Sequence, residues 1–165
     1  MKVYHGSTEV IKCPLVSKGR QNLDFGQGFY ITDIIKQAKD WATRPINKAK
    51  PQYLNIYEFD SEMVKAEGYH YVKFEEYDGY WLDFVITNRH GEKPTVEYDI
   101  VEGGIANDRV FNTIELYDAG LITREEALSR LRYETPNNQI CILRQDIIDK
   151  YLLFEEAQLL NGNGR

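Results

Sequence analysis

Two short segments near the N-terminus carry residues that could bind a ligand. The first ends a predicted strand with His5, Gly6 and Ser7, which offer an imidazole, a backbone without a side chain and a hydroxyl. The second is the glycine-punctuated stretch DFGQGFYIT at 24–32, which leads into a strand that carries Tyr30. Small residues let a ligand approach the backbone closely, and an aromatic ring offers it a flat surface. Together the two segments predict a nucleotide pocket.

Other chemistries fit the residue pattern less well. Cys13 and Cys141 have neither CxxC spacing nor a local nucleophile signature, so two reduced thiols are a simpler interpretation than a cysteine–histidine hydrolase. The three histidines lie outside any HExxH or paired Cys/His motif, which argues against a dedicated metal site. Gly26 and Gly28 match neither the GxGxxG nor the Walker A spacing and precede a strand, which argues against a Rossmann or P-loop fold.

Each candidate residue also has a purely structural interpretation. A lone strand histidine such as His5 is more often a satisfied structural residue, and a strand tyrosine such as Tyr30 belongs more often to a core or its rim. Gln139, at the start of a later predicted strand, could simply satisfy a backbone group. The residue types alone leave both interpretations open.

The elements that must position these residues alternate between strand and helix patterns. Strands are predicted at 2–7, 28–32, 52–59, 98–102, 139–143 and 152–157, with a strand or loop at 69–74. Helices are predicted at 33–42, 79–86, 107–117, 123–131 and 146–151. This interleaving without repeats favours a mixed α+β fold with a single domain over 1–160 and a frayed tail at 161–165.

Three helical segments carry specific local signals. Asp33 is predicted to cap the helix after the 24–32 stretch, and the Thr123 to Glu126 spacing predicts a capping box. Trp81 is predicted to lie in the core on one side of the 79–86 helix. The apolar positions of the helix that Asp33 caps are expected to share one buried face: Ile34, Ile35, Ala38, Trp41 and Ala42.

Charge and hydropathy limit the partners. The formal net charge of -6 weakly disfavours nucleic acid, because phosphate neutralisation needs a basic surface, although a local basic groove is compatible with it. No apolar stretch is long enough to span a bilayer, and the N-terminus lacks an apolar signal-peptide region. We therefore expect a cytoplasmic protein that does not enter a membrane.

In these residues and their spacing, the chain resembles the ADP-ribosyltransferase superfamily. Within it, the chain is similar to small bacterial transferase-like proteins that are associated with toxin–antitoxin loci and filed as a domain of unknown function. The blocks that carry the resemblance are YHGS at 4–7, DFGQGFYIT at 24–32 with QA at 37–38 and WA at 41–42, WLDFV at 81–85 with NR at 88–89, YDIVEGGIAND at 98–108, and QICI at 139–142. They span nearly the whole chain, and the second block is the most specific.

The resemblance implies a split, mainly antiparallel β core with flanking helices and with NAD, as co-substrate, in the cleft between two small sheets. It implies that His5 hydrogen-bonds a ribose hydroxyl and that Gly6 offers backbone groups to the nicotinamide amide. It also implies that Tyr30 stacks on the nicotinamide ring, as an aromatic face would do with a flat cation. Three further residues complete the expected cofactor-binding set: Ser7, Gly28 and Thr32.

The third catalytic position departs from the better-known pattern. Many active relatives carry a glutamate there, whereas this chain has Gln139, which can orient the ribose but supplies no negative charge where positive charge develops. We therefore expect slow or single transfer rather than polymer growth. Glu102 and Glu134 are candidate substitute carboxylates, although each is expected to be a solvated surface charge.

The implied function is a NAD-dependent mono-ADP-ribosyltransferase, the toxin of a bacterial toxin–antitoxin system with a cognate antitoxin as partner. Its acceptor stays open between protein, RNA, DNA and a small molecule. The alternative is a catalytically silent NAD-binding or protein-interaction module. The uncharged Gln139 is the feature that supports this alternative. Four residues of the family blocks have no derived role, although the first two are expected to pair structurally: Arg89, Asp99, Asn107 and Asp108.

Overall fold

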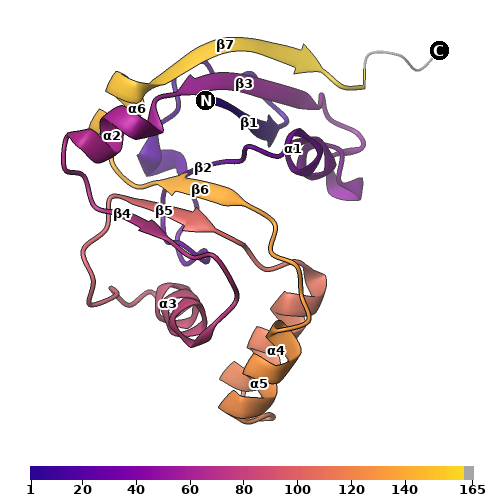
Figure 1. Ribbon diagram of the computed structural model, residues 1–165. Coiled ribbons are helices and arrows are strands. Elements are labelled where there is room, and N and C mark those ends of the chain that lie inside the picture. The colour runs from indigo at the N-terminus through magenta and orange to yellow at the C-terminus, as the bar shows by residue number, and fades with distance from the viewer. Residues whose placement is uncertain (162–165) are drawn as a thin grey trace.

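Two small β-sheets form the centre of the computed structural model, which describes residues 1–161 (Figure 1). The three-stranded sheet has the order β1-β3-β7, with β1 at Lys2–Ser7, β3 at Tyr53–Phe59 and β7 at Leu152–Leu159. The four-stranded sheet has the order β2-β6-β5-β4, with β2 at Phe29–Ile31, β6 at Gln139–Ile142, β5 at Ile100–Gly103 and β4 at Tyr71–Lys73. All neighbouring strands are antiparallel except β4 and β5.

Helices flank the two sheets. They are α1 (Ile35–Ala42), α2 (Ser61–Ala66), α3 (Gly79–Arg89), α4 (Asp108–Asp118), α5 (Arg124–Leu131) and α6 (Gln145–Tyr151). Figure 1 shows α1 beside β1 and β2, α3 on the side of the four-stranded sheet that faces away from the other sheet, and α4 with α5 as an extended hairpin. The fold class is therefore α+β, as the sequence predicts, with mostly antiparallel sheets and flanking helices.

The alternation of β2 separates two hydrophobic clusters. Phe29 and Ile31 point into a cluster that includes Tyr57 of β3 and therefore lies between the sheets. Tyr30, between them, packs on the opposite face against a cluster that contains Trp81 of α3. Trp81 is fully buried, which confirms its predicted place in the core. The direction of each side chain on β2 is thus fixed by the two-residue period of the strand.

Side-chain caps begin several of the helices, but Asp33 is not one of them. Thr123 and Glu126 form the predicted capping box at the start of α5. At α1, the N-cap residue is Ile34, which makes no side-chain cap. The hydroxyl of Thr32 accepts a hydrogen bond from the Ile34 N–H, and the Asp33 carboxylate instead accepts one from Asn138 Nδ2. The prediction of an Asp33 cap was wrong because the helix begins one residue later and the Asp33 carboxylate bonds Asn138 instead.

The buried face of α1 is narrower than the sequence predicts. Ala38 and Ala42 are buried, whereas Ile34, Ile35 and Trp41 are each 41% exposed. The cause is the close approach of α1 to β1. A Cβ at Gly6 would lie 1.9 Å from the Ala38 carbonyl oxygen, so the helix backbone rests directly on the glycine and only small residues fit beneath it.

Three further differences from the sequence expectations concern α2, the end of α3 and the C-terminal tail. The helix α2 was not predicted, and α3 extends to Arg89 instead of ending at 86. The expected tail begins at Asn161, which the structure holds in place, because its side chain donates to the Lys50 carbonyl and accepts from the Gln52 N–H. The rest of that tail, 162–165, lies outside the described residues.

Candidate functional site

The strands β1 and β2 touch at one point and then separate. Tyr4 and Thr32 exchange two backbone hydrogen bonds of 2.8 and 2.9 Å. If the antiparallel pairing continued for two more residues, Gly6 would lie opposite Tyr30. Within residues 1–161, however, no backbone hydrogen bond joins these two residues. The Tyr30 carbonyl instead accepts a hydrogen bond of 2.6 Å from His5 Nδ1. Because Gly6 follows Tyr4 by two residues, its N–H and C=O point toward the same side, which is the separation between the strands.

His5 is held in a defined orientation at this separation. Its ring lies 4.7 Å from the ring of Phe29, and its Nδ1 faces the Tyr30 carbonyl, which can only accept a hydrogen bond. Nδ1 therefore carries the proton, and Nε2 of the neutral ring is left as an acceptor. Burial lowers the pKa of His5, which keeps the ring neutral at pH 7. The geometry suits a hydroxyl donor on a ligand.

Tyr30 connects the strand to the glycine-rich loop before it. Its hydroxyl donates to the Gly26 carbonyl at 2.7 Å and accepts from the Phe25 N–H at 3.1 Å. Its ring lies nearly parallel to that of Phe25, at 13° and 6.5 Å between centroids. Burial raises the pKa of Tyr30, so the phenol stays protonated. The hydroxyl is therefore engaged in holding the loop, and the half-buried ring is the part that could contact a ligand.

Gln139 lies close to Tyr30 in the sheet. It begins β6 and pairs with Gly103 of β5. Tyr30 pairs with Cys141, two residues further along β6, so alternation places the side chains of Gln139 and Tyr30 on the same face of the sheet. His5 contacts the opposite face, through Phe29. The structure thus brings Gln139 and Tyr30 to one face, with His5 at the strand edge beside them.

The three residues expected to support the pocket make structural contacts of their own. The Thr32 hydroxyl donates to the Asn138 carbonyl at 2.6 Å, and Thr32 is buried. The Ser7 hydroxyl accepts from the Glu9 N–H at 3.1 Å. A Cβ at Gly28 would lie 2.5 Å from Cys141 Sγ, so the glycine permits close packing of the loop on β6.

An amide nitrogen that sequence reasoning missed lies next to this site. Gln37 of α1 accepts a hydrogen bond from the N–H of Asn138, the residue before Gln139, at 3.3 Å. Its Nε2 is buried and has no hydrogen-bond partner among the residues that the structure describes. A buried donor without a partner is costly, so Nε2 is available to an acceptor oxygen of a bound ligand. The local sequence around Gln37 carries no signal for this role, because the contact arises from a residue 101 positions away.

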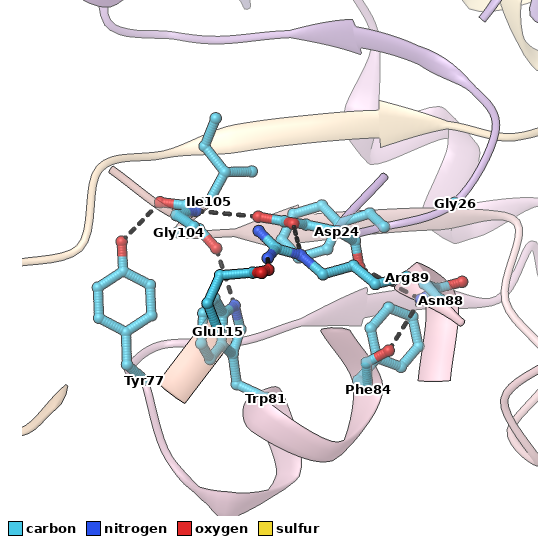
Figure 2. A network of polar contacts seen from close by, with 12 residues as sticks. Asp24, Gly26, Tyr77, Trp81, Phe84, Asn88, Arg89, Gly104, Ile105 and Glu115 are labelled. Atoms are coloured by element: carbon cyan, nitrogen blue, oxygen red, sulfur yellow. Dashed lines mark hydrogen bonds and ion pairs between the residues drawn. The ribbon is translucent and has the colours of Figure 1, made fainter. Parts of the chain in front are cut away.

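A partly buried ion pair anchors the start of the glycine-rich loop (Figure 2). Asp24 Oδ1 accepts from Arg89 Nε at 2.8 Å, and Asp24 Oδ2 accepts from the Ala106 N–H at 2.9 Å. The two charged side chains are only 12% and 16% exposed. Asn88, beside Arg89 on α3, also donates to the Asp24 carbonyl at 3.3 Å. The loop is therefore tied both to α3 and to the segment after β5.

The segment after β5 is held by two aromatic side chains that Figure 2 also shows. Trp81 Nε1 donates to the Gly104 carbonyl at 2.8 Å, and the Tyr77 hydroxyl donates to the Ile105 carbonyl at 2.9 Å. Burial raises the pKa of Tyr77 to about 12, so its hydroxyl remains a donor at neutral pH. Three of the sequence blocks, 24–32, 81–89 and 98–108, thus meet in one hydrogen-bond network.

The expected pairing of Arg89 with Asp99 is wrong. Arg89 pairs with Asp24, whereas Asp99 accepts from the His70 N–H at 2.9 Å and lies 3.6 Å from Arg144 Nη1. The other two unassigned residues act at a helix start. Asn107 caps α4, and Asp108 lies in its first turn, where a negative charge is favourable.

Glu102 is not the solvated surface charge that the sequence suggests. Its side chain is 13% exposed, and its carboxylate accepts from the Tyr71 hydroxyl and from Asn138 Nδ2. Burial and this contact raise the pKa of Tyr71. Glu102 pairs with Ile140, the neighbour of Gln139, so its side chain lies on the other face of the sheet. Glu134, the other candidate carboxylate, is partly exposed.

A large open cavity lies elsewhere. It measures about 910 Å³ and is lined by 67–70, 93–94, 96–99, Leu143 and Arg144, with none of His5, Tyr30 or Gln139 in its wall. Within 1–161, no group of three or more His, Cys, Asp and Glu residues is placed to hold a metal ion. No helix of the described chain is both long and apolar enough to cross a membrane.

The fold and the site define an α+β protein whose β core is split into two small sheets that separate beside His5 and Gly6. Over residues 1–154 the sequence matches a family described as a protein of unknown function (DUF3990), and the chain belongs to that family. No curated protein and no solved structure matches the chain.

Proposed function

We propose that the protein is a NAD-dependent mono-ADP-ribosyltransferase whose nicotinamide subsite lies where β1 and β2 separate. The observation that carries the proposal is the unpaired edge at Gly6. Gly6 is buried, and its N–H and C=O point into the separation instead of pairing with Tyr30. A carboxamide supplies one acceptor and two donors, so the amide of nicotinamide matches this pair of backbone groups.

The side chains around Gly6 fit the rest of the co-substrate. His5 Nε2 can accept from a ribose hydroxyl, because Nδ1 is occupied by the Tyr30 carbonyl. The ring of Tyr30 offers a face to the cationic nicotinamide ring, and Gln139 on the same face of the sheet can orient the ribose. Gln37 Nε2 adds a buried donor beside them. The residues present therefore fit NAD.

In the proposed reaction, the bond between the nicotinamide nitrogen and the ribose carbon breaks, and nicotinamide leaves with the bonding electron pair. A nucleophilic atom of the acceptor forms the new bond to that carbon and loses its proton. Tyr30, His5 and Gln139 orient the NAD throughout. Because Gln139 carries no charge, stabilisation of the positive ribose is weaker than a carboxylate would give, which favours slow, single transfer.

We further propose a bacterial toxin that acts in the cytoplasm and is restrained by a cognate antitoxin protein. This part of the proposal is supported only by the resemblance of the sequence blocks. The alternative function is a catalytically silent NAD-binding or protein-interaction module. Two observations favour it, namely the uncharged Gln139 and the Tyr30 hydroxyl that is already bound to Gly26.

The test is incubation of the purified protein with NAD labelled on its adenylate phosphate, with and without cell lysate. We expect nicotinamide release and label on a macromolecule, and digestion by nuclease or protease then identifies the acceptor class. NAD binding without release in any lysate would favour the silent module. Absence of both binding and release at millimolar NAD would overturn the proposed function and its alternative binding role together.

A further inference from the structure

Positive charge is concentrated in one part of this acidic chain. Residues 10–50 contain eight Lys or Arg residues and three Asp residues, so the segment has a formal charge of +5 in a chain of net charge -6. Of the three carboxylates, Asp24 is paired with Arg89 and Asp40 with Lys36. Within the described part of the chain, the other seven cations of the segment have no ion pair: Lys12, Lys18, Arg20, Lys39, Arg44, Lys48 and Lys50.

One of these cations, Arg44, stacks on an exposed tryptophan. The guanidinium carbon of Arg44 lies 3.4 Å from the centre of the Trp41 ring, and Arg44 Nε donates to the Trp41 carbonyl at 3.2 Å. Trp41 is 41% exposed. Partial burial and the nearby positive charge of Arg20 lower the pKa of Arg44. Arg20 and Lys48 are exposed, and Arg44 and Lys48 flank the short 3-10 helix Pro45–Asn47 as its N-cap and C-cap residues.

This basic patch, which we define as Arg20, Trp41, Arg44 and Lys48, adjoins the proposed pocket. Gly19, next to Arg20, packs against the glycine-rich loop, since its Cβ would lie 2.4 Å from the Gly28 carbonyl oxygen.

The helix α1 connects the patch with the pocket. Gln37 lies four residues before Trp41 and therefore on the same side of this helix. The hydrogen bond of Gln37 to Asn138 places that side next to Gln139. Figure 1 shows α1 beside both β1 and β2.

We propose that the basic patch binds single-stranded nucleic acid and presents it to the site as the acceptor. Unpaired cations around an exposed ring are the two components by which single strands are bound without sequence preference, because the cations contact phosphates and the ring stacks on bases. The acidic net charge does not oppose this, since the 10–50 segment itself carries a formal charge of +5. The acceptor role rests on the proposed function, whereas the binding itself does not.

The test is the binding of fluorescently labelled oligothymidine and oligouridine, in the absence of NAD, over a range of salt concentrations. The wild type should bind more weakly as salt rises. The Arg20→Ala/Arg44→Ala variant should lower the slope of log affinity against log salt by about 1.4, because each removed cation loses one phosphate contact, which is worth about 0.7 on a single strand. Trp41→Ala should weaken binding about tenfold with little change in slope.

The matched control is Arg130→Ala/Arg132→Ala, which removes the same charge from exposed positions at the end of α5. It should leave affinity unchanged, and melting curves should confirm that all variants are folded. Failure of the wild type to bind at low salt, or equal loss of binding in the control, would overturn the proposal. A patch variant that raises the KM for NAD in nicotinamide release while oligonucleotide binding is unchanged would also overturn it, because the patch would then serve the NAD diphosphate.

The same measurements separate this inference from the proposed function. Oligonucleotide binding that depends on the patch, together with no NAD turnover, would support the surface and reject the transferase. Turnover that labels only protein, at the same rate in the patch variants, would support the transferase and reject the nucleic-acid acceptor.

Discussion

Replacing Asp24 by alanine should lower the free energy of unfolding by about 3 kcal/mol, or the melting temperature by about 6–12 °C in a chain of this size. The change leaves the Arg89 guanidinium without its closest partner and removes the acceptor of the Ala106 N–H. Partly buried donors and charges left without a partner carry most of this cost. Chemical denaturation and thermal melting of the purified variant measure the effect.

The matched control is Asp40→Ala, which breaks the i,i+4 pair with Lys36 on the surface of α1. The Asp40 side chain is 62% exposed, so this variant should change stability by at most about 0.5 kcal/mol. If Asp24→Ala and Asp40→Ala melt at the same temperature, the pair with Arg89 does not anchor the glycine-rich loop.

Replacing Gln139 by alanine should reduce nicotinamide release by about 100- to 1000-fold, the effect of losing one preorganised polar contact in a catalytic site. Gln139→Glu should retain or raise the wild-type rate, because a carboxylate restores negative charge beside the positive ribose. Gln158→Ala is the control, since that glutamine is exposed on β7 and bonds only to Glu156 in the described structure. Nicotinamide release and growth inhibition on expression are the two readouts.

Two outcomes would change the assignment of Gln139. A Gln139→Ala variant with wild-type rates would make the glutamine a strand-start residue, and the third catalytic group would have to be sought elsewhere. A silent wild type that gains NAD turnover through Gln139→Glu would identify the protein as a pseudoenzyme.

Local patterns predicted most of the framework. The strands β1, β3 and β6 follow from short runs of β-branched and aromatic residues, and the capping box at Thr123 depends only on residues three apart. The helix α2 was missed because it has six residues, too few for a helical period to be distinguished. The exposure of Trp41 was also missed, because it depends on how closely α1 approaches Gly6.

The candidate site was only partly visible in the sequence. The separation of β1 from β2 places His5 and Gly6 beside Tyr30, but no residue pattern shows where a strand pair ends. The partner of Arg89 is 65 positions away, and the nearer Asp99 was the natural but wrong choice. Likewise, the contact of Gln37 with Asn138, and the amide nitrogen that it leaves without a partner among the described residues, arise from packing between distant segments.

The most direct test of the account is a titration of the ¹⁵N-labelled protein with NAD, followed by amide chemical shifts. The account predicts that the Gly6, Tyr30 and Gln139 amides shift together with a common dissociation constant, while those of His70 and Arg144 at the large cavity do not. If NAD leaves the Gly6 amide unchanged, or shifts only the residues of that cavity, the separation between β1 and β2 is not a nicotinamide site.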